Sequence, residues 1–355
     1  MSRILVINPG STSTKIAVYE NENLKNETTL RHSVEEINEF DTLYDQKDFR
    51  KRIIVDFLNE SGFDISDFDA IIGRGGLLKP IESGTYDINE KMIDHLKKAT
   101  YGEHASNLGG ILAKELAEGK IPSFIADPVV VDEMSEIARL SGHPDYERKS
   151  IFHALNQKAV AREVSKRIGE SYEDINLIVV HIGGGISIGA HCKGRVIDVN
   201  NALNGEGPYS PERSGTLPLT GLINICFNEE NSYNRVKKMI KGKGGLYAYT
   251  GTNSGMEINE EIKEGNEEYE KYYLGMGYQI VKWIGQMTTV LKGDVRMIIF
   301  TGGLAHDMDI LMPFITERVS FIAPVEIIPG GDEERALALA ALRVLNNDES
   351  AKEYV

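Results

Sequence analysis

Two turns in the sequence combine glycine with polar side chains in a way that suits a phosphate group. The first lies within residues 7–15, INPGSTSTK, where Gly10 lets another group approach the backbone closely. Hydroxyls, free backbone N–H groups and an ammonium are the groups with which proteins bind phosphate. We therefore expect phosphate contacts from Ser11, Ser13 and Lys15. An ordinary hairpin with a Ser/Thr-rich turn would have the same sequence features, so this turn alone leaves both interpretations open.

The second turn lies at the corresponding place in the second half of the chain. Residues 177–191 read LIVVHIGGGISIGAH, again an apolar run, a glycine-rich turn and a second apolar run. Aligning Asn8 with His181 also aligns Gly10 with Gly183. This repeat predicts a duplicated domain whose two hairpins hold a nucleotide triphosphate from both sides, although a bare glycine turn would also fit. The phosphate contacts that we expect here come from His181, Gly183, Gly184 and Gly185.

A third glycine-rich turn follows the apolar residues 297–301. Gly302 and Gly303 come directly after this predicted strand, and we expect a helix to begin there. The N-terminus of a helix offers free N–H groups, and glycine leaves room for a flat ring or a phosphate. Packing of the helix start against the strand would also require glycine, so the turn has a structural explanation as well.

Five further side chains have types and positions that suit phosphoryl transfer. Arg74 and Arg213 lie in loops, and a guanidinium binds carboxylates and phosphoryl oxygens through two parallel hydrogen bonds. Asp127 ends a predicted strand, where a carboxylate can project into a cleft. His104 and His153 each precede a predicted helix. Taken singly, a loop arginine is more often solvated, and a lone histidine is more often a cap or a core hydrogen-bonding group.

The elements that must position these residues follow from hydrophobic periodicity. The first half predicts a strand meander followed by alternating helices and strands, a pattern typical of an α/β fold. Its predicted strands are 4–7, 16–19, 25–32, 70–73 and 123–127, and its predicted helices are 47–59, 89–99 and 105–117. The second half predicts strands at 176–182, 187–191, 195–199, 297–301 and 325–328, and helices at 153–168, 219–227, 233–240, 267–291 and 332–345. We interpret 242–255 as a surface loop and the acidic run 257–270 as a solvated face.

The composition limits the class of protein. The chain has 355 residues, a formal net charge of −15 and two cysteines, which together argue against nucleic acid binding and against a disulfide framework. No basic and apolar leader precedes the first strand, and polar residues interrupt the long apolar stretch 272–291. We therefore expect a cytoplasmic protein without membrane partners, and a homo-oligomer (dimer or higher) in which helix 272–291 contributes to a subunit contact.

The motifs occur in the order found in the acetate and butyrate kinases. The segment INPGSTSTKIAVY at residues 7–19 resembles the start of the butyrate kinases, and the resemblance extends over nearly the whole chain. It implies an α/β fold of two duplicated actin-like (RNase H-like) domains, each a mixed five-stranded sheet flanked by helices, with a cleft between them. We expect residues 1–129 with 335–355 to form the first domain. Residues 130–334 would form the second, with the adenosine pocket.

The resemblance also implies an activity and its catalytic residues. The activity is reversible transfer of the γ-phosphoryl group of ATP to butanoate, or to a related short- or branched-chain fatty acid, giving an acyl phosphate and ADP. Arg74 and Arg213 match arginines around the substrate carboxylate and the transferring phosphoryl group. His153 would hydrogen-bond that group in the transition state and His104 would support the site, while Asp127 matches an acidic residue near the metal and the acyl substrate.

Metal and nucleoside contacts follow from the same resemblance. Asn8 and Glu333 would orient Mg²⁺ through its water ligands, although an alignment shift of one residue leaves Glu334 as the alternative. Carboxylates in the first turn of a helix are also favoured by the helix dipole, whatever their function. Gly302 and Gly303 would line the adenosine pocket.

One position departs from the acetate kinases, whose second hairpin carries HLGNGSS. Here Gly184 takes the place of the asparagine in HIGGGIS, so phosphate binding would depend on backbone N–H groups. This change, the N-P-G segment and the shorter chain favour a butyrate kinase over an acetate or propionate kinase. Two other classes on the same scaffold stay open: a sugar kinase with Asp127 as its base, and an ATP-driven conformational switch.

Overall fold

The computed structural model describes residues 1–355, and the chain divides into two compact units. Unit 1 comprises Met1–Val131 together with Asp332–Val355, and unit 2 comprises Asp132–Gly331. The last helix of the chain therefore belongs to the same unit as the first strand.

Unit 1 is built on a six-stranded mixed sheet with the order β3-β2-β1-β4-β6-β5. The first three strands form an antiparallel meander, while β4 runs parallel to β1 and β6 runs parallel to β4. We predicted five strands for this sheet, and the structure adds a sixth, the three-residue strand β5, which pairs antiparallel with β6. The bounds are β1 (Arg3–Pro9), β2 (Ser13–Glu20), β3 (Asn23–Arg31), β4 (Ala70–Arg74), β5 (Thr85–Asp87) and β6 (Ser123–Ala126).

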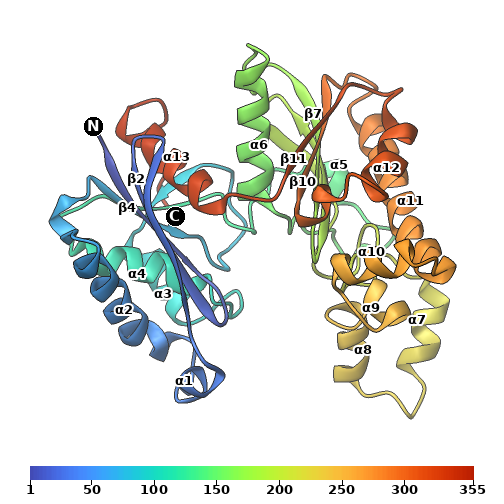
Figure 1. Ribbon diagram of the computed structural model, residues 1–355, viewed down its shortest axis with the longest axis horizontal. Helices are drawn as coiled ribbons and strands as arrows, with labels where there is room; N and C mark the ends of the chain where they lie inside the picture. Colours follow the sequence, from blue (N-terminus) through green and yellow to red (C-terminus); the bar gives the residue numbers. More distant parts are fainter. The chain divides into compact units, whose positions relative to one another are not determined.

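Helices cover both faces of this sheet, which explains why β1 and β4 read as continuous apolar runs. Figure 1 shows α13 on one side and α4, next to α2 and α3, on the other. The helix α4 lies against β4 so closely that a Cβ on Gly73 would overlap the backbone of Gly109. The helices are α1 (Val34–Asn38), α2 (Lys47–Glu60), α3 (Glu90–Lys97), α4 (Asn107–Ala117) and α13 (Glu333–Leu345).

Unit 2 contains a five-stranded mixed sheet with the order β11-β10-β7-β8-β9. Alternate residues of β7 enter two separate cores: Leu177 and Val179 pack with α6, whereas Ile178 and Val180 pack with α11. The bounds are β7 (Asn176–Ile182), β8 (Ile186–Cys192), β9 (Arg195–Val199), β10 (Met297–Gly302), β11 (Val325–Pro329), α6 (Ala154–Arg167) and α11 (Glu267–Val290).

Several predictions for unit 2 differ from the structure. The predicted loop 242–255 contains a short helix, the acidic run 257–270 belongs to two helices, and a further helix begins at Leu311. The glycine turn after β10 leads into the 3₁₀ turn Gly303–His306 and not directly into an α-helix. No helix in either unit is long and apolar enough to cross a membrane. The remaining helices are α5 (Glu136–Arg139), α7 (Leu219–Cys226), α8 (Tyr233–Ile240), α9 (Leu246–Thr250), α10 (Gly255–Lys263) and α12 (Leu311–Val319).

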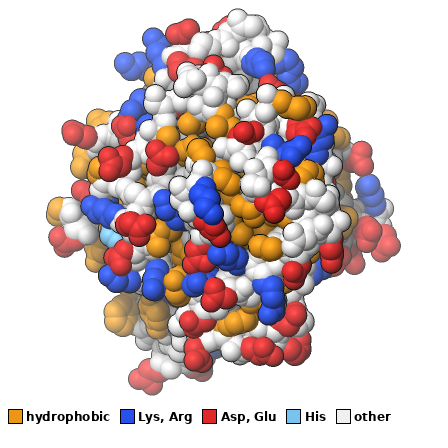
Figure 2. Space-filling view, turned by 90° about the vertical axis from the view of Figure 1, so that its left-hand side faces the viewer, with side chains coloured by type: hydrophobic (Ala, Val, Ile, Leu, Met, Phe, Trp, Pro, Cys, Tyr) orange, Lys and Arg blue, Asp and Glu red, His pale blue; other side chains and the backbone are white.

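The surface carries charges of both signs. On the face shown in Figure 2, acidic and basic side chains are interspersed with hydrophobic ones, and no continuous basic area is visible. This face therefore offers no extended positive surface to a polyanion such as nucleic acid.

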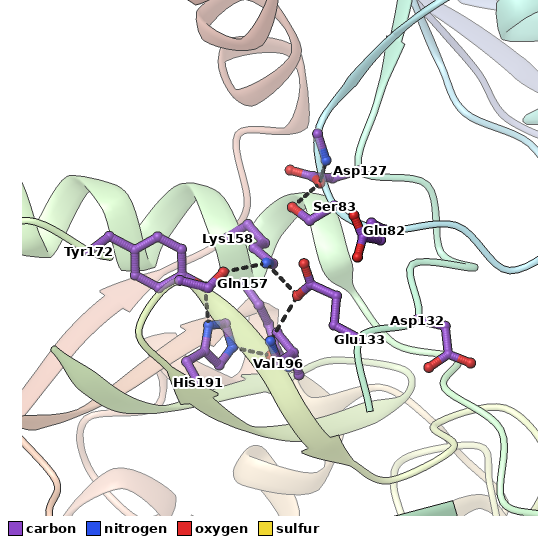
Figure 3. Close-up of polar contacts among 12 residues, drawn as sticks. Glu82, Ser83, Asp127, Asp132, Glu133, Gln157, Lys158, Tyr172, His191 and Val196 are labelled. Carbon is purple, nitrogen blue, oxygen red and sulfur yellow. Dashed lines mark hydrogen bonds and ion pairs between the residues drawn. The ribbon is translucent and has the colours of Figure 1, made fainter. Parts of the chain in front are cut away.

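A buried ion pair joins α6 to the segment that enters unit 2. Lys158 is 1% exposed at its side chain and donates from Nζ to Glu133 Oε2 and to the carbonyl oxygen of Gly194, both at 2.7 Å. The same Glu133 oxygen accepts from the backbone N–H of Val196 at 2.8 Å (Figure 3). Because Gly194 lies in the β8–β9 turn and Val196 lies in β9, this pair ties that hairpin to α6.

We expect Lys158→Met to lower the free energy of unfolding by about 3–5 kcal/mol, because the buried Glu133 carboxylate loses the ammonium that lies 2.7 Å from it. Denaturant unfolding followed by circular dichroism measures this loss. The double variant Lys158→Met/Glu133→Gln removes both charges and should recover part of the stability. A single variant as stable as the unsubstituted protein would show that the pair contributes nothing.

Candidate active site

The turn between β1 and β2 is held from behind by Arg50. This side chain lies on α2, is fully buried, and donates to the carbonyl oxygens of Gly10, Ser11 and Ser13 at 2.9, 3.1 and 2.9 Å. Burial lowers the pKa of Arg50 to about 10, so the guanidinium remains charged at neutral pH. The carbonyl dipoles of the turn therefore face the protein interior, and the outer side is left without groups that would repel a phosphate.

Our sequence analysis missed Arg50, although a signal for it is present. The buried residues of α2 are Arg50, Ile54 and Leu58, which follow one another at four-residue spacing on one face of the helix. A charged residue in an otherwise apolar stripe needs a buried partner. Here the partners are the backbone carbonyls of the turn.

The predicted metal residues of unit 1 lie together. Asn8 lies one residue before the end of β1 and donates from Nδ2 to Glu333 Oε2 at 2.9 Å and to Glu334 Oε1 at 2.8 Å. Arg74, at the end of the adjacent β4, lies 3.0 Å from Glu333 and 3.4 Å from Asn8 Oδ1. Lys15 Nζ lies 3.7 Å from Glu334. The carboxyl end of two parallel strands and the start of α13 thus assemble five of the candidate polar groups.

This cluster fits a magnesium ion better than a metal with a full set of protein ligands. Neither unit contains a group of three or more His, Cys, Asp or Glu side chains arranged to hold a metal. Mg²⁺ prefers oxygen ligands and usually retains several waters, so one or two carboxylates suffice. Glu333 and Glu334 with the amide of Asn8 supply such a donor set.

Asp127 and His104 have local partners in unit 1. Asp127 is buried, adopts an uncommon φ of 37°, and accepts at Oδ1 from Ser83 Oγ at 2.6 Å and from the N–H of Gly84 at 2.9 Å. His104 is exposed before α4 and contacts Ser106 through Nδ1. These contacts fix Oδ1 of Asp127 on the neighbouring loop, and the predicted role of this carboxylate beside a substrate stays a prediction.

Two histidine rings stack in unit 2. His153 precedes α6 and His181 lies in β7, with ring centroids 3.7 Å apart and planes inclined by 11°. Desolvation, and secondarily the charge of Arg213, lower the pKa of His181 to about 4, so this ring is neutral at neutral pH. His181 Nδ1 lies 2.7 Å from Asn156 Oδ1, and His153 Nδ1 lies 2.8 Å from Ser187 Oγ. Both rings are therefore fixed through Nδ1.

Arg213 packs directly on the glycine turn of unit 2. Its Nη1 donates to the carbonyl oxygen of Ala202 at 2.6 Å, and its Nη2 lies 3.5 Å from Glu212. Its Nε is buried without a hydrogen-bond partner, and burial lowers the pKa of Arg213 below the ordinary arginine value. A Cβ at Gly185 would overlap the guanidinium, which gives this glycine a specific reason to be present. Arg213 thus retains hydrogen-bonding capacity beside the turn.

The two glycines after β10 differ in their surroundings. Gly302 is buried with a φ of 90° and exchanges backbone hydrogen bonds with Gly330, at 2.7 and 2.9 Å. A Cβ at Gly302 would meet the carbonyl oxygen of Ile182 at 2.5 Å, so packing alone requires this glycine. Gly303 is exposed with open space above it. Of the two, only Gly303 has room for a ligand at its own Cα.

Comparison with known proteins decides the family. The acetokinase family model matches residues 145–323. Butyrate kinase 1 of Clostridium acetobutylicum is 53% identical over 355 residues, which is all of both chains. A probable butyrate kinase of Clostridium botulinum (strain Alaska E43 / Type E3) is 53% identical over 353 residues, or 99% of each chain. This chain belongs to the acetokinase family.

The fold of this acetokinase family member matches a solved structure. The crystal structure of Porphyromonas gingivalis acetate kinase gives a TM-score of 0.81 at 20% identity, covering 97% of this chain and 100% of that chain. This likeness confirms the predicted α/β fold of duplicated actin-like domains. The resemblance to the acetate and butyrate kinases is likewise confirmed.

We expect Gly185→Ala to lower kcat by about 10²-fold, because the new methyl group displaces the Arg213 guanidinium and a misplacement of about 1 Å has an effect of this size. Steady-state kinetics of acyl phosphate formation measures the change, and circular dichroism checks the fold. Gly285→Ala is the matched control, since a Cβ there meets nothing within 4 Å. Equal kcat values for the two variants would contradict a role for the packing of Arg213 on the turn.

Proposed function

We propose that this protein is a butyrate kinase, which transfers the γ-phosphoryl group of ATP to butanoate or a related short- or branched-chain fatty acid. The products are the acyl phosphate and ADP, and the reaction is reversible. The observation that carries the proposal is the 53% identity to Butyrate kinase 1 of Clostridium acetobutylicum along the entire chain. An acetate or propionate substrate is the less favoured alternative.

The proposed reaction needs no general base. A carboxylic acid of this kind is already ionised near neutral pH, so the nucleophile is ready when it binds. The remaining tasks are alignment of donor and acceptor and neutralisation of the phosphoryl charge. We assign the second task to Arg74 of unit 1 and to Arg213 and His153 of unit 2.

In unit 1 we propose that Asn8 and Glu333 orient Mg²⁺ through its waters. Glu333 suits this role better than Glu334, because its side chain is 28% exposed whereas Glu334 is buried beside Lys15. When bound, Mg²⁺ neutralises charge on the β- and γ-phosphate oxygens. Arg74 pairs with Glu333, and we propose that the same guanidinium also binds the substrate carboxylate beside the metal.

Hydroxyl, ammonium and backbone N–H groups would bind the phosphates. In unit 1 these groups belong to Ser11, Ser13 and Lys15, and in unit 2 they belong to the turn Gly183–Gly185. His181, whose neutral ring packs against Gly183, would support that turn without donating to the phosphate. Gly302 and Gly303 would border the adenosine. Gly302 would contribute by letting the backbone turn at a positive φ, and Gly303 by leaving open space above its Cα. Asp127 and His104 would support the site through the loops that they contact.

We also propose a cytoplasmic homo-oligomer. Cys192 and Cys226 are free thiols, which suits a reducing compartment. Two large apolar side chains are exposed at α7: Leu219 begins the helix and is 77% exposed, and Phe227 directly follows it and is 85% exposed. We propose that they contribute to the contact between subunits.

The decisive experiment traps the product with hydroxylamine, using ATP, Mg²⁺ and a series of straight and branched C2 to C6 acids. We expect hydroxamate formation to be fastest for the four- and five-carbon acids. Each methylene is worth about 0.8 kcal/mol of burial, so neighbouring acids should differ by about fourfold in kcat/KM. Without an acid, ATP hydrolysis should be slow, because an enzyme that phosphorylates a carboxylate has to exclude water as the competing acceptor. Phosphorylation of sugars without hydroxamate, or rapid hydrolysis without acid, would contradict the proposal.

We expect Arg213→Ala to lower kcat by about 10²–10³-fold, the usual loss when one donor to a transition-state charge is removed. Arg213→Lys keeps the positive charge but loses the guanidinium fork, so it should recover only part of this activity. Single-turnover measurements with saturating ATP separate the chemical step from binding. A kcat that is unchanged in Arg213→Ala would remove this residue from the mechanism.

A further inference from the structure

Behind His153, a chain of hydrogen bonds runs through the interior of unit 2. It begins at Ser187, a fully buried residue of β8 whose hydroxyl lies 2.8 Å from His153 Nδ1 and 2.8 Å from Gln157 Nε2. A hydroxyl has one hydrogen to donate and two lone pairs to accept with. Which of its partners receives that hydrogen decides which nitrogen of His153 carries the ring proton.

The amide of Gln157 has a defined orientation. Its Nε2 donates to the backbone carbonyl of Ser187 at 3.0 Å as well as to the hydroxyl, and a carbonyl can only accept. Its Oε1 therefore points the other way, toward His191 Nε2 at 3.0 Å. Gln157 is fully buried in α6, so no solvent competes for either end of the amide.

His191 is the next member of this chain of hydrogen bonds (Figure 3). Because Gln157 Oε1 can only accept, the proton of His191 sits on Nε2. Burial holds the pKa of His191 well below its usual range, so the ring is neutral and Nδ1 has a lone pair. That lone pair accepts from the hydroxyl of Tyr172 at 2.7 Å.

The orientation of the Gln157 amide also determines the protonation of His153. The Ser187 hydroxyl accepts from Gln157 Nε2 at 2.8 Å and from the backbone N–H of His153 at 3.4 Å, so both lone pairs are used and its own hydrogen is left to donate to His153 Nδ1. A neutral His153 ring that accepts at Nδ1 carries its proton on Nε2 and is a hydrogen-bond donor there. The opposite tautomer would present a lone pair at Nε2, which repels a phosphoryl oxygen.

We propose that Tyr172, His191, Gln157 and Ser187 are positioning residues that keep His153 in the Nε2–H form needed to donate to the transferring phosphoryl group. This inference rests on the proposed role of His153 in the kinase reaction. The neighbouring ring shows that the arrangement is specific. His181 places Nδ1 against Asn156 Oδ1, whose amide nitrogen faces Thr301 Oγ1, so His181 carries its proton on Nδ1. The two stacked rings thus hold opposite tautomers.

Gln157→Glu is the sharpest test when measured at a pH high enough to ionise the buried carboxyl group, because an ionised carboxylate of the same shape can only accept. The Ser187 hydroxyl would then donate to Glu in place of His153, and the His153 proton would move to Nδ1. We expect the ¹⁵N NMR shifts of labelled histidine, assigned with a His153→Gln spectrum, to change from the Nε2–H to the Nδ1–H pattern. We expect kcat to fall by about 10²-fold, as for the loss of a transition-state donor, with a much smaller change in the KM for ATP.

Changes at Ser187 supply the control and a second test. Ser187→Thr keeps the hydroxyl and should retain both the Nε2–H pattern and most of kcat. Ser187→Ala removes the donor, so the Nδ1–H form should appear in the spectrum and kcat should fall by about fivefold, the net worth of one hydrogen bond. If Gln157→Glu does not fold, this pair of variants decides the question.

Two results would overturn the proposal: an Nδ1–H tautomer in the unsubstituted protein, or an unchanged Nε2–H spectrum and kcat in the folded variants Gln157→Glu and Ser187→Ala. The NMR readout does not depend on turnover. A protein that shows the Nε2–H pattern but forms no hydroxamate would therefore refute the proposed kinase function and leave the tautomer assignment intact.

Discussion

Buried hydrogen bonds behind two glycine-containing turns are the feature on which the candidate site depends. The hydroxyls at corresponding positions of the repeat, Thr14 and Ser187, are both fully buried, and each contacts a histidine ring, His32 or His153. Each turn has one internal backbone hydrogen bond, from Gly10 N–H to Ser13 O at 2.8 Å or from Gly183 N–H to Gly185 O at 3.0 Å, and needs further support if its other N–H and hydroxyl groups are to stay available to a ligand. Side chains from neighbouring helices supply that support from inside, where the hydrogen bonds are shielded from water and hold one geometry.

The two halves achieve this support with different electrostatics. In unit 1 the support is a cation, since Arg50 donates to Thr14 Oγ1 at 3.0 Å as well as to the carbonyls of the turn. In unit 2 it is a neutral amide, Gln157, followed by a neutral imidazole. The positive charge at the second turn comes instead from Arg213, which packs on Gly185. The same backbone repeat is therefore supported by a charged side chain in unit 1 and by neutral side chains in unit 2. In unit 2 the direction of the hydrogen bonds, and not a charge, determines which nitrogen of His153 carries the proton.

The sequence was informative where local chemistry determines the structure. Strong apolar runs predicted β1, β7, β8 and β10, and the internal repeat together with the family motifs predicted the fold. It failed where long-range packing decides. The three residues of β5 become a strand only by pairing with β6, and the turn after β10 forms a 3₁₀ helix because Gly302 pairs with Gly330. Arg50, Gln157 and Ser187 were missed because their importance comes from buried partners on other elements. Asn8 and Glu333 were chosen through family resemblance, and no local pattern could have joined them, because α13 returns from the far end of the chain.

The return of α13 also constrains the order in which the protein can mature during synthesis. Unit 2 is one continuous stretch, so it can complete its core while the ribosome is still translating the last helix. Unit 1 cannot: until Asp332–Val355 emerges, one face of its sheet is uncovered and Asn8 lacks both of its carboxylate partners. Before α13 emerges, the nascent chain therefore has no complete acidic cluster beside β1, and Asn8 meets its carboxylate partners only after all of unit 2 has been synthesised.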